Sequence, residues 1–248
     1  MNLCLENKTV FITGASSGIG AAAARIFAEE GAHVALAYHR NREGAEASAA
    51  AARSLGRQTA LVEMDLADPD AIARAAAALS PPFDALDALV LCAGQNIVTP
   101  IDRITPEEWE HIIAVNLNGP FYVLQALAPR LNDGGSVVTV ASVAAHTGNA
   151  NHPHYAAAKA GLVNLTKSFA RALAPRVRVN CLAPGITLTP MGRATTAALP
   201  PNYAETKLLT GRYATPEEIA RWIVFLASPA AAFMTGATVD VNGGRDLR

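Results

Sequence analysis

Short apolar runs, often β-branched, alternate along this chain with longer, alanine-rich segments. Consecutive apolar positions are typical of a strand buried on both faces of a parallel sheet. The longer segments repeat apolar residues at helical spacing, and several begin at a proline or end at a glycine. The pattern predicts strands at residues 9–12, 33–38, 59–62, 88–91, 136–140, 177–182 and 237–241. It predicts helices at residues 19–31, 42–55, 69–79, 106–117, 119–131, 155–173 and 216–226.

Strands that alternate with helices in this way predict an α/β fold, a doubly wound parallel β-sheet of the Rossmann type with about seven strands and helices on both faces. A chain of 248 residues without a repeat, a low-complexity tail or a linker suits one domain, so residues 1–248 are expected to form a single unit. One stretch, residues 187–213, is turn-rich and is expected to be irregular.

The charge balance and the cysteines narrow the class of protein. With 20 basic and 21 acidic side chains, the net charge of −1 argues against a non-specific nucleic-acid binder. No apolar stretch is expected to be long enough to cross a bilayer, and the N-terminus has no signal-peptide pattern. The three cysteines are scattered without metal-ligand spacing, which favours a reducing compartment, so a cytoplasmic enzyme acting on a small molecule is expected.

A glycine-rich turn follows the first predicted strand and opens the first helix. Glycines allow a tight turn and a close approach to a pyrophosphate, and a helix N-terminus offers free N–H groups to the anion. The spacing of these glycines differs from the G-x-G-x-x-G fingerprint. The prediction of a phosphate-binding turn therefore depends on the position of the turn between the first strand and the first helix of a βαβ unit. The predicted phosphate-binding residues are Gly14, Ser16, Ser17, Gly18, Ile19 and Gly20.

Four further motifs follow in a characteristic order. Tyr155 and Lys159 form a Tyr-x-x-x-Lys pair, and Ser142 precedes the tyrosine by 13 positions. Asn116 stands in Val-Asn-Leu, and residues 184–189 read Pro-Gly-Ile-Thr-Leu-Thr. Over essentially its whole length the chain resembles the classical short-chain dehydrogenase/reductase family, whose members transfer hydride between a nicotinamide cofactor and a carbonyl or alcohol carbon.

This resemblance implies roles for individual residues. Tyr155 is expected to be the acid or base, Ser142 to hold the substrate oxygen, and Asn116 to hold a water that serves Lys159. Lys159 is also expected to bind the nicotinamide ribose, and its ammonium to lower the pKa of Tyr155. The other cofactor contacts that it implies are Asp65, Leu66, Ala93, Gly94, Pro184, Gly185, Ile186 and Thr189.

One position departs from the family pattern. Cys92 stands where the family carries an asparagine that ties strands together, and it is interpreted as a small buried hydrophobic residue. Such a loss of hydrogen bonds costs roughly 0.5–1.5 kcal/mol for each bond.

The end of the second strand favours one cofactor. His39 and Arg40 follow this strand, and no acidic residue appears before Glu43. A basic side chain here pairs with a 2′-phosphate, whereas a carboxylate pairs with ribose hydroxyls. NADP(H) is therefore favoured and NAD(H) remains open, since many relatives also carry a basic residue at the position of Ser17.

The substrate cannot be identified from the motifs. By position, the pocket walls are expected to include Gln95, Ala144, Asn149, His152 and Met191, with residues 187–213 as a lid. His154 and Arg193 are further candidates for substrate contact. The expected function is an NADP(H)-dependent carbonyl reductase; an NAD-dependent alcohol or polyol dehydrogenase and a non-catalytic nicotinamide sensor are the alternatives. The resemblance also implies a homotetramer.

Overall fold

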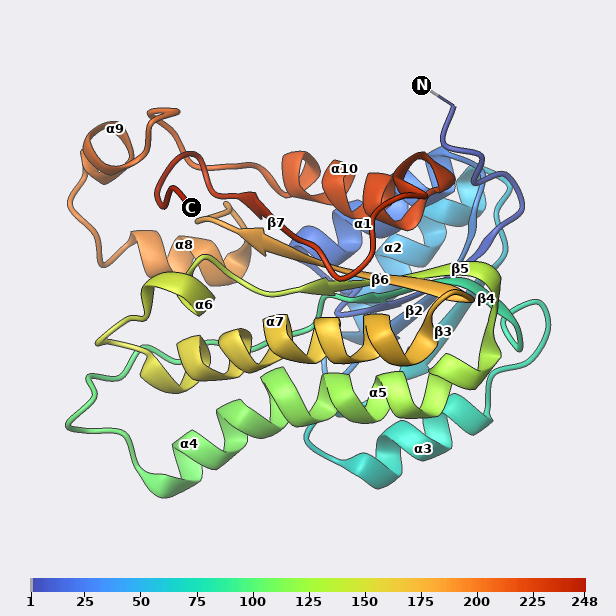
Figure 1. Ribbon diagram of the computed structural model, residues 1–248, viewed down its shortest axis with the longest axis horizontal. Coiled ribbons are helices and arrows are strands. Elements are labelled where there is room, and N and C mark those ends of the chain that lie inside the picture. Colours follow the sequence, from blue (N-terminus) through green and yellow to red (C-terminus); the bar gives the residue numbers. More distant parts are fainter. Residues whose placement is uncertain (1) are drawn as a thin grey trace.

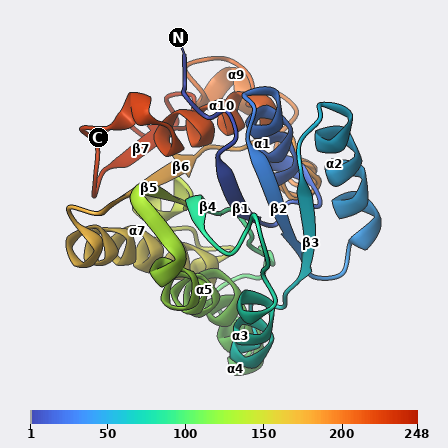
Figure 2. The ribbon, with the colours of Figure 1, turned by 90° about the vertical axis from the view of Figure 1, so that its right-hand side faces the viewer.

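Seven parallel strands form one sheet. The computed structural model describes residues 2–248. Its strands lie in the order β3-β2-β1-β4-β5-β6-β7 (Figure 2), which confirms the predicted fold class. Their bounds are β1 Thr9–Thr13, β2 His33–Tyr38, β3 Thr59–Glu63, β4 Leu86–Leu91, β5 Leu131–Val140, β6 Val177–Pro184 and β7 Thr238–Val241.

Helices cover both faces of this sheet (Figure 1). One layer holds α1 (Gly18–Glu29), α2 (Arg42–Ser54) and α10 (Pro216–Ala227), and its core includes Phe27 and Ile223. The opposite layer holds α3 (Pro69–Ala77), α4 (Pro106–Ile113), α5 (Gly119–Leu127) and α7 (Pro153–Leu173). Phe11 and Leu124 are fully buried beneath that second layer. Burial on both sides explains why the strands are apolar at consecutive positions.

The strand order reverses between β1 and β4, because the chain first builds outward to β3 and then returns. Ligands of doubly wound sheets bind beyond the carboxyl ends of the strands at such a point. At this end of the sheet lie the short helices α6 (Ala144–Thr147), α8 (Pro190–Thr196) and α9 (Tyr203–Lys207) (Figure 1). The fold therefore places a cleft where the sequence motifs converge.

The prediction that residues 187–213 are irregular is wrong in part, because α8 and α9 lie there. These helices have only seven and five residues, and none of those residues is buried. Without a buried face they carry no apolar periodicity for a sequence pattern to reveal. A Thr-Pro pair does mark the start of α8: Thr189 caps it by accepting a hydrogen bond from the N–H of Gly192 at 3.0 Å.

The expectation that no stretch is long and apolar enough to cross a bilayer is also wrong. Two predicted helices join through a π-helical segment, Ala114–Asn118, into one helix at Pro106–Arg130. An 18-residue window of this helix has a mean hydropathy of 1.2, and 44% of that window is buried. In this fold the helix packs against α3 and α7, as a core helix does.

Arg178 on β6 joins the sheet to the end of α10. Its guanidinium donates to the carbonyl oxygens of Leu226, Ser228 and Ala231, each at 3.0 Å. The last carbonyls of a helix have no partner within it, and hydrogen bonds from a charged donor contribute about 1.5–3 kcal/mol.

We therefore expect Arg178→Met to lower the free energy of unfolding by about 3 kcal/mol, since the carbonyls at the end of α10 lose a charged donor. Urea denaturation followed by circular dichroism measures the effect. Arg171→Met is the matched control, because Arg171 is exposed on α7 and its variant should stay within about 0.5 kcal/mol of wild type. Equal midpoints for the two variants would contradict this role of Arg178.

Candidate active site

The glycine-rich turn after β1 has no room for side chains. A Cβ at position 20 would lie 2.3 Å from the carbonyl oxygen of Gly14. Gly18 has a φ of +55°, and a Cβ there would lie 2.9 Å from Cγ2 of Thr189. Ser17 precedes α1 without capping it, so the first N–H groups of this helix stay available to an anion. The six residues predicted to bind phosphate all line one cleft, of about 630 Å³.

Two side chains of the α2 region hold this turn in place. Nδ2 of Asn41 donates to the carbonyl oxygen of Ser16 at 3.1 Å, and the hydroxyl of Ser48 donates to that of Ala15 at 2.8 Å. Asn41 also caps α2 by accepting from the N–H of Gly44. Sequence reasoning missed both residues; the cap could be found from an asparagine before a helix, but the contact with the loop could not.

The ends of β2 and β3 meet at one side of the cleft. Nε2 of His39 lies 3.5 Å from Oδ2 of Asp65, while Arg40 is exposed and also lines the cleft. Asp68, rather than Asp65, caps α3, accepting from the N–H of Asp70 at 2.9 Å. Asp65 is therefore free of a capping role, and Arg40 is the cation that this end presents to an anionic ligand.

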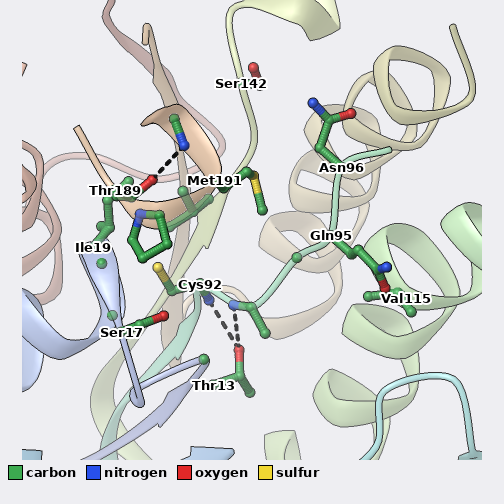
Figure 3. A pocket seen from close by; sticks show the side chains of 18 of the residues that line it. Thr13, Ser17, Ile19, Cys92, Gln95, Asn96, Val115, Ser142, Thr189 and Met191 are labelled. Carbon is green, nitrogen blue, oxygen red and sulfur yellow. Dashed lines mark hydrogen bonds between the residues drawn. The ribbon is translucent and has the colours of Figure 1, made fainter. Parts of the chain in front are cut away.

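Cys92 follows β4 at the middle of the cleft. In Figure 3 it lies between Ser17 and Ile19 on one side and Gln95 and Val115 on the other. The hydroxyl of Thr13 accepts from the N–H of Cys92 and from that of Ala93, both at 3.1 Å, and so ties β1 to β4.

The Cys92 side chain packs against the core beneath α1 and α10. Burial raises the pKa of its thiol to about 12, which keeps the sulfur protonated. These findings support the interpretation of Cys92 as a small hydrophobic residue.

Ser142, Tyr155 and Lys159 come together across β5 and α7. Ser142 follows β5, and the other two residues lie one turn apart on α7, so their side chains share a face. Tyr155 and Ser142 face the same cleft, and the serine side chain is close enough to influence the pKa of the tyrosine. Nζ of Lys159 donates to the carbonyl oxygen of Val140 at 2.9 Å and lies 5.6 Å from the centre of the tyrosine ring. All three residues line the same cleft as the glycine-rich turn.

Asn116 lies behind this group, fully buried in the π-helical segment. Its Nδ2 donates to the carbonyl oxygens of Ile112 and Gln95 at 2.9 and 2.8 Å, and its Oδ1 accepts from the N–H of Gln95 at 3.2 Å. A Cβ at Gly94 would lie 2.8 Å from Oδ1 of Asn116 and 3.3 Å from Nζ of Lys159. Gly94 therefore allows Asn116 and Lys159 to approach each other.

The expectation that Lys159 lowers the pKa of Tyr155 is wrong for the chain by itself. Burial raises the pKa of Tyr155 to about 12, although the side chain of Ser142 opposes the rise. Burial also lowers the pKa of Lys159 to about 8. The lysine nitrogen lies over the ring and is bonded to Val140, so desolvation outweighs its attraction for a phenolate.

Four of the five expected substrate residues line the cleft: Gln95, Ala144, His152 and Met191. Asn149 is not among the described lining residues, and its Oδ1 instead accepts from the N–H of Asn151 at 2.8 Å. An asparagine at the start of a loop forms such local turns readily.

His154 and Arg193 do not line the cleft either. Nε2 of the buried His154 lies 3.0 Å from a carboxylate oxygen of Glu108, on α4. Its Nδ1 accepts from the N–H of Tyr155 at 3.0 Å, so the histidine supports the first turn of α7. Arg193 is exposed on α8.

Sequence reasoning missed three polar residues of the substrate end, Asn96, His111 and Arg245. Nε2 of His111 lies 2.8 Å from Oε1 of Gln95. Oδ1 of Asn96 is buried and has no partner among residues 2–248, so a ligand could donate to it. These residues come from α4, the loop after β4 and the C-terminal tail, and no motif links them in the sequence.

The cleft fits a nicotinamide dinucleotide. Its lining includes every residue predicted to contact the cofactor, from Arg40 and Asp65 through the glycine-rich turn to residues 184–189. The uncapped start of α1 suits a pyrophosphate, and the exposed Arg40 suits a further phosphate. A Cβ at Gly185 would lie 2.8 Å from Asn242, so the loop after β6 is held close against the chain end.

Comparisons with known proteins identify the family of this chain. A family model described as enoyl-(acyl carrier protein) reductase matches residues 14–246. The chain is 37% identical to a 3-oxoacyl-(acyl-carrier-protein) reductase, FabG, of Thermotoga maritima, covering 97% of this chain and 98% of that protein. It is 39% identical to a D-threitol dehydrogenase of Mycolicibacterium smegmatis, over 98% of this chain and 95% of that protein.

A solved short-chain dehydrogenase from Burkholderia cenocepacia, in complex with NADP, is 32% identical and superimposes with a TM-score of 0.91, covering 98% of this chain and 99% of that one. A match of this length in sequence and in structure establishes the family. The chain belongs to the short-chain dehydrogenase/reductase family and is an oxidoreductase that acts on carbonyl or alcohol groups.

Proposed function

We propose that this enzyme interconverts a ketone and a secondary alcohol with NADP(H), and that Tyr155 exchanges the proton. The observation that carries the proposal is the meeting of Ser142, Tyr155 and Lys159 in the cleft of the glycine-rich turn. The whole chain acts as one dinucleotide-binding and catalytic domain, with residues 187–213 as the substrate lid. The position of α8 beside the cleft supports that role of the segment.

Each residue of the set has a task. Bound NADP(H) supplies or accepts the hydride. Ser142 holds the substrate oxygen, and Tyr155 gives it a proton in reduction or takes one in oxidation. Lys159 binds the ribose, and Asn116 holds a water behind it. Burial raises the pKa of Tyr155 to about 12, so the hydroxyl carries its proton at neutral pH.

The choice of NADP(H) rests on Arg40. Its guanidinium is exposed at the end of β2, whereas Asp65 lies beside His39. A charge-assisted hydrogen bond to a 2′-phosphate contributes about 1.5–3 kcal/mol, or roughly 10- to 100-fold in affinity. The Burkholderia cenocepacia relative, solved with NADP, also favours this cofactor.

Arg40→Ala is therefore expected to weaken NADPH binding by roughly 10- to 100-fold and to leave NADH binding nearly unchanged. Fluorescence titration of the reduced cofactor measures both affinities. Arg42→Ala is the matched control, because Arg42 begins α2 and does not line the cleft. An equal loss for both cofactors, or none for NADPH, would contradict the assignment.

A polyol dehydrogenase that uses NAD is the second candidate. The polar side chains of Gln95, Asn96 and His152 support it, as does the similarity to a D-threitol dehydrogenase. The discriminating experiment follows absorbance at 340 nm with ketones plus NADPH and with sugar alcohols plus NAD. Reduction of ketones supports the proposal, and oxidation of polyols with NAD supports the alternative. Cofactor binding without turnover of any compound would instead indicate a nicotinamide sensor.

A homotetramer and a cytoplasmic location complete the proposal. Phe121 on α5 is partly exposed, and its ring centre lies 6.0 Å from that of Phe169 on α7. The two rings offer an apolar surface to a second copy of the chain. The three cysteines are free thiols, as a reducing compartment favours. Light scattering tests the assembly: a mass near four chains of 25.8 kDa supports it, and the mass of one chain would refute it.

A further inference from the structure

The charges along the cleft are distributed unevenly. Among the described lining residues, the fully charged side chains are Arg40, Asp65, Lys159 and Arg245. Asp65 lies beside His39 at the cofactor end, where Arg40 also lies. Lys159 is bonded to the backbone beneath Tyr155. Arg245 is therefore the one remaining cation of this lining, and the only carboxylate of the lining, Asp65, belongs to the cofactor end.

Arg245 lines the same cleft as His152 and Tyr155. Burial, the neighbouring His154 and the charge of Arg245 together lower the pKa of His152, so this guanidinium is within electrostatic reach of that ring. The ring of His152 in turn packs edge-on against the ring of Tyr155, with 5.7 Å between their centres. A substrate whose oxygen meets Tyr155 thus occupies a cleft that also contains this cation.

A compact turn at the chain end positions Arg245. Asn242 accepts from the N–H of Gly244 at 2.9 Å and donates from Nδ2 to the carbonyl oxygen of Asp246 at 2.9 Å. Gly244 has a φ of +74°, and a Cβ there would lie 2.7 Å from Leu209 of the lid segment. A side chain at position 244 would therefore displace the lid segment.

Asp240, the acidic residue of β7, is paired with residues other than Arg245. Asp240 accepts from Arg248 at 2.6 Å and lies 3.6 Å from Nε2 of His146. Among residues 2–248, Arg245 makes no ion pair with an acidic side chain. Asp240 is thus paired with Arg248 and His146, while Arg245 lines the cleft.

We propose that Arg245 binds an anionic group of the substrate, so that the enzyme selects ketones or alcohols that carry a carboxylate or a phosphate ester. This inference rests on the proposed function, because it assigns the substrate class of the same cleft. A guanidinium binds either anion through two parallel hydrogen bonds, and a half-exposed site is screened by water. We therefore expect discrimination of about tenfold, the lower end of the range for a charged hydrogen bond.

The kinetic test compares acids with their neutral amides. The ketones are 3-oxobutanoate, 4-oxocyclohexanecarboxylate and 4-acetylbenzoate, each paired with its primary amide and assayed with NADPH. Wild type should show a kcat/KM about tenfold higher for at least one acid than for its amide. Arg245→Met should bring that ratio to within about twofold of one, largely through KM, and Arg245→Lys should retain part of it.

Arg171→Met is the matched control: Arg171 is exposed on α7 and does not line the cleft, so this variant should keep the wild-type ratio. Equal kcat/KM for every acid and amide in wild type, or an unchanged ratio in Arg245→Met, would overturn the assignment.

A binding experiment separates this inference from the proposed function. Calorimetry on the NADPH-loaded protein compares cyclohexanecarboxylate, cyclohexyl phosphate and cyclohexanecarboxamide. Tighter binding of either anion than of the amide in wild type, lost in Arg245→Met, supports the site and identifies the preferred anion. Equal binding of all three contradicts it. If no ketone or alcohol is turned over, the proposed function fails, and the calorimetry still decides whether Arg245 holds an anion.

Discussion

Replacing Tyr155 by phenylalanine is expected to lower kcat/KM for ketone reduction by roughly 10²- to 10⁴-fold, the usual contribution of a positioned general acid. The variant keeps the ring that packs against His152 and loses only the hydroxyl, which lies near Ser142. NADPH affinity should stay within about threefold of wild type, because Lys159 and the glycine-rich turn are unchanged. Steady-state kinetics and a fluorescence titration measure the two effects.

Tyr122→Phe is the matched control for this variant. Tyr122 lies on α5 beside Phe121, away from the cleft, so loss of its hydroxyl should leave turnover unchanged. Wild-type reduction by Tyr155→Phe would exclude the tyrosine as the acid. A parallel loss in both tyrosine variants would indicate a structural effect instead.

Replacing Lys159 by methionine is expected to abolish most turnover and yet to stabilise the fold. Burial holds the pKa of Lys159 at about 8 rather than 10.5, which costs the folded state about 3 kcal/mol at pH 7. The variant also loses the hydrogen bond to Val140, which destabilises the folded state by about 1–2 kcal/mol and offsets part of the benefit of removing the buried charge. The free energy of unfolding at pH 7 should therefore rise by about 1–2 kcal/mol. The wild-type lysine lowers the stability of the fold in exchange for activity, a trade-off found at many functional sites.

The pH dependence of stability checks the same lysine. Between pH 8 and 10.5 the unfolded lysine keeps its proton while the folded one has lost it, so stability rises with pH in this window. Relative to Lys159→Met, wild type should gain about 1 kcal/mol from pH 8 to pH 9.

Urea denaturation at several pH values provides the measurement, with Lys167→Met, at an exposed position of α7, as the control. A constant difference between wild type and Lys159→Met across this window would show that burial does not depress the pKa.

The sequence predicts the fold well because the central strands are buried on both faces and each long helix has one apolar face. The prediction fails where a strand or helix lacks this pattern of burial. β5 begins at Leu131, five residues before the predicted strand, because the exposed residues 132–134 break the apolar run. The helices α6, α8 and α9 are too short to show a period.

The motifs also locate the reactive groups, since loops after neighbouring strands of a parallel sheet meet at one edge. Burial is a property of the folded molecule, so the raised pKa of Tyr155 and the depressed pKa of Lys159 could not be read from their spacing. Arg245 reaches the cleft from the C-terminal tail, and Asn41 holds the glycine-rich turn from another helix. Both contacts depend on tertiary packing that no local pattern records.

The central claim is that the cleft binds NADP(H) through Arg40 and holds the cofactor beside Tyr155. Fluorescence titration of the purified protein with NADPH and, separately, with NADH tests it most directly. We expect NADPH to bind at least about tenfold more tightly, as the guanidinium at the end of β2 requires. Tighter binding of NADH would contradict this account of the cofactor, and binding of neither would contradict the assignment of the cleft itself.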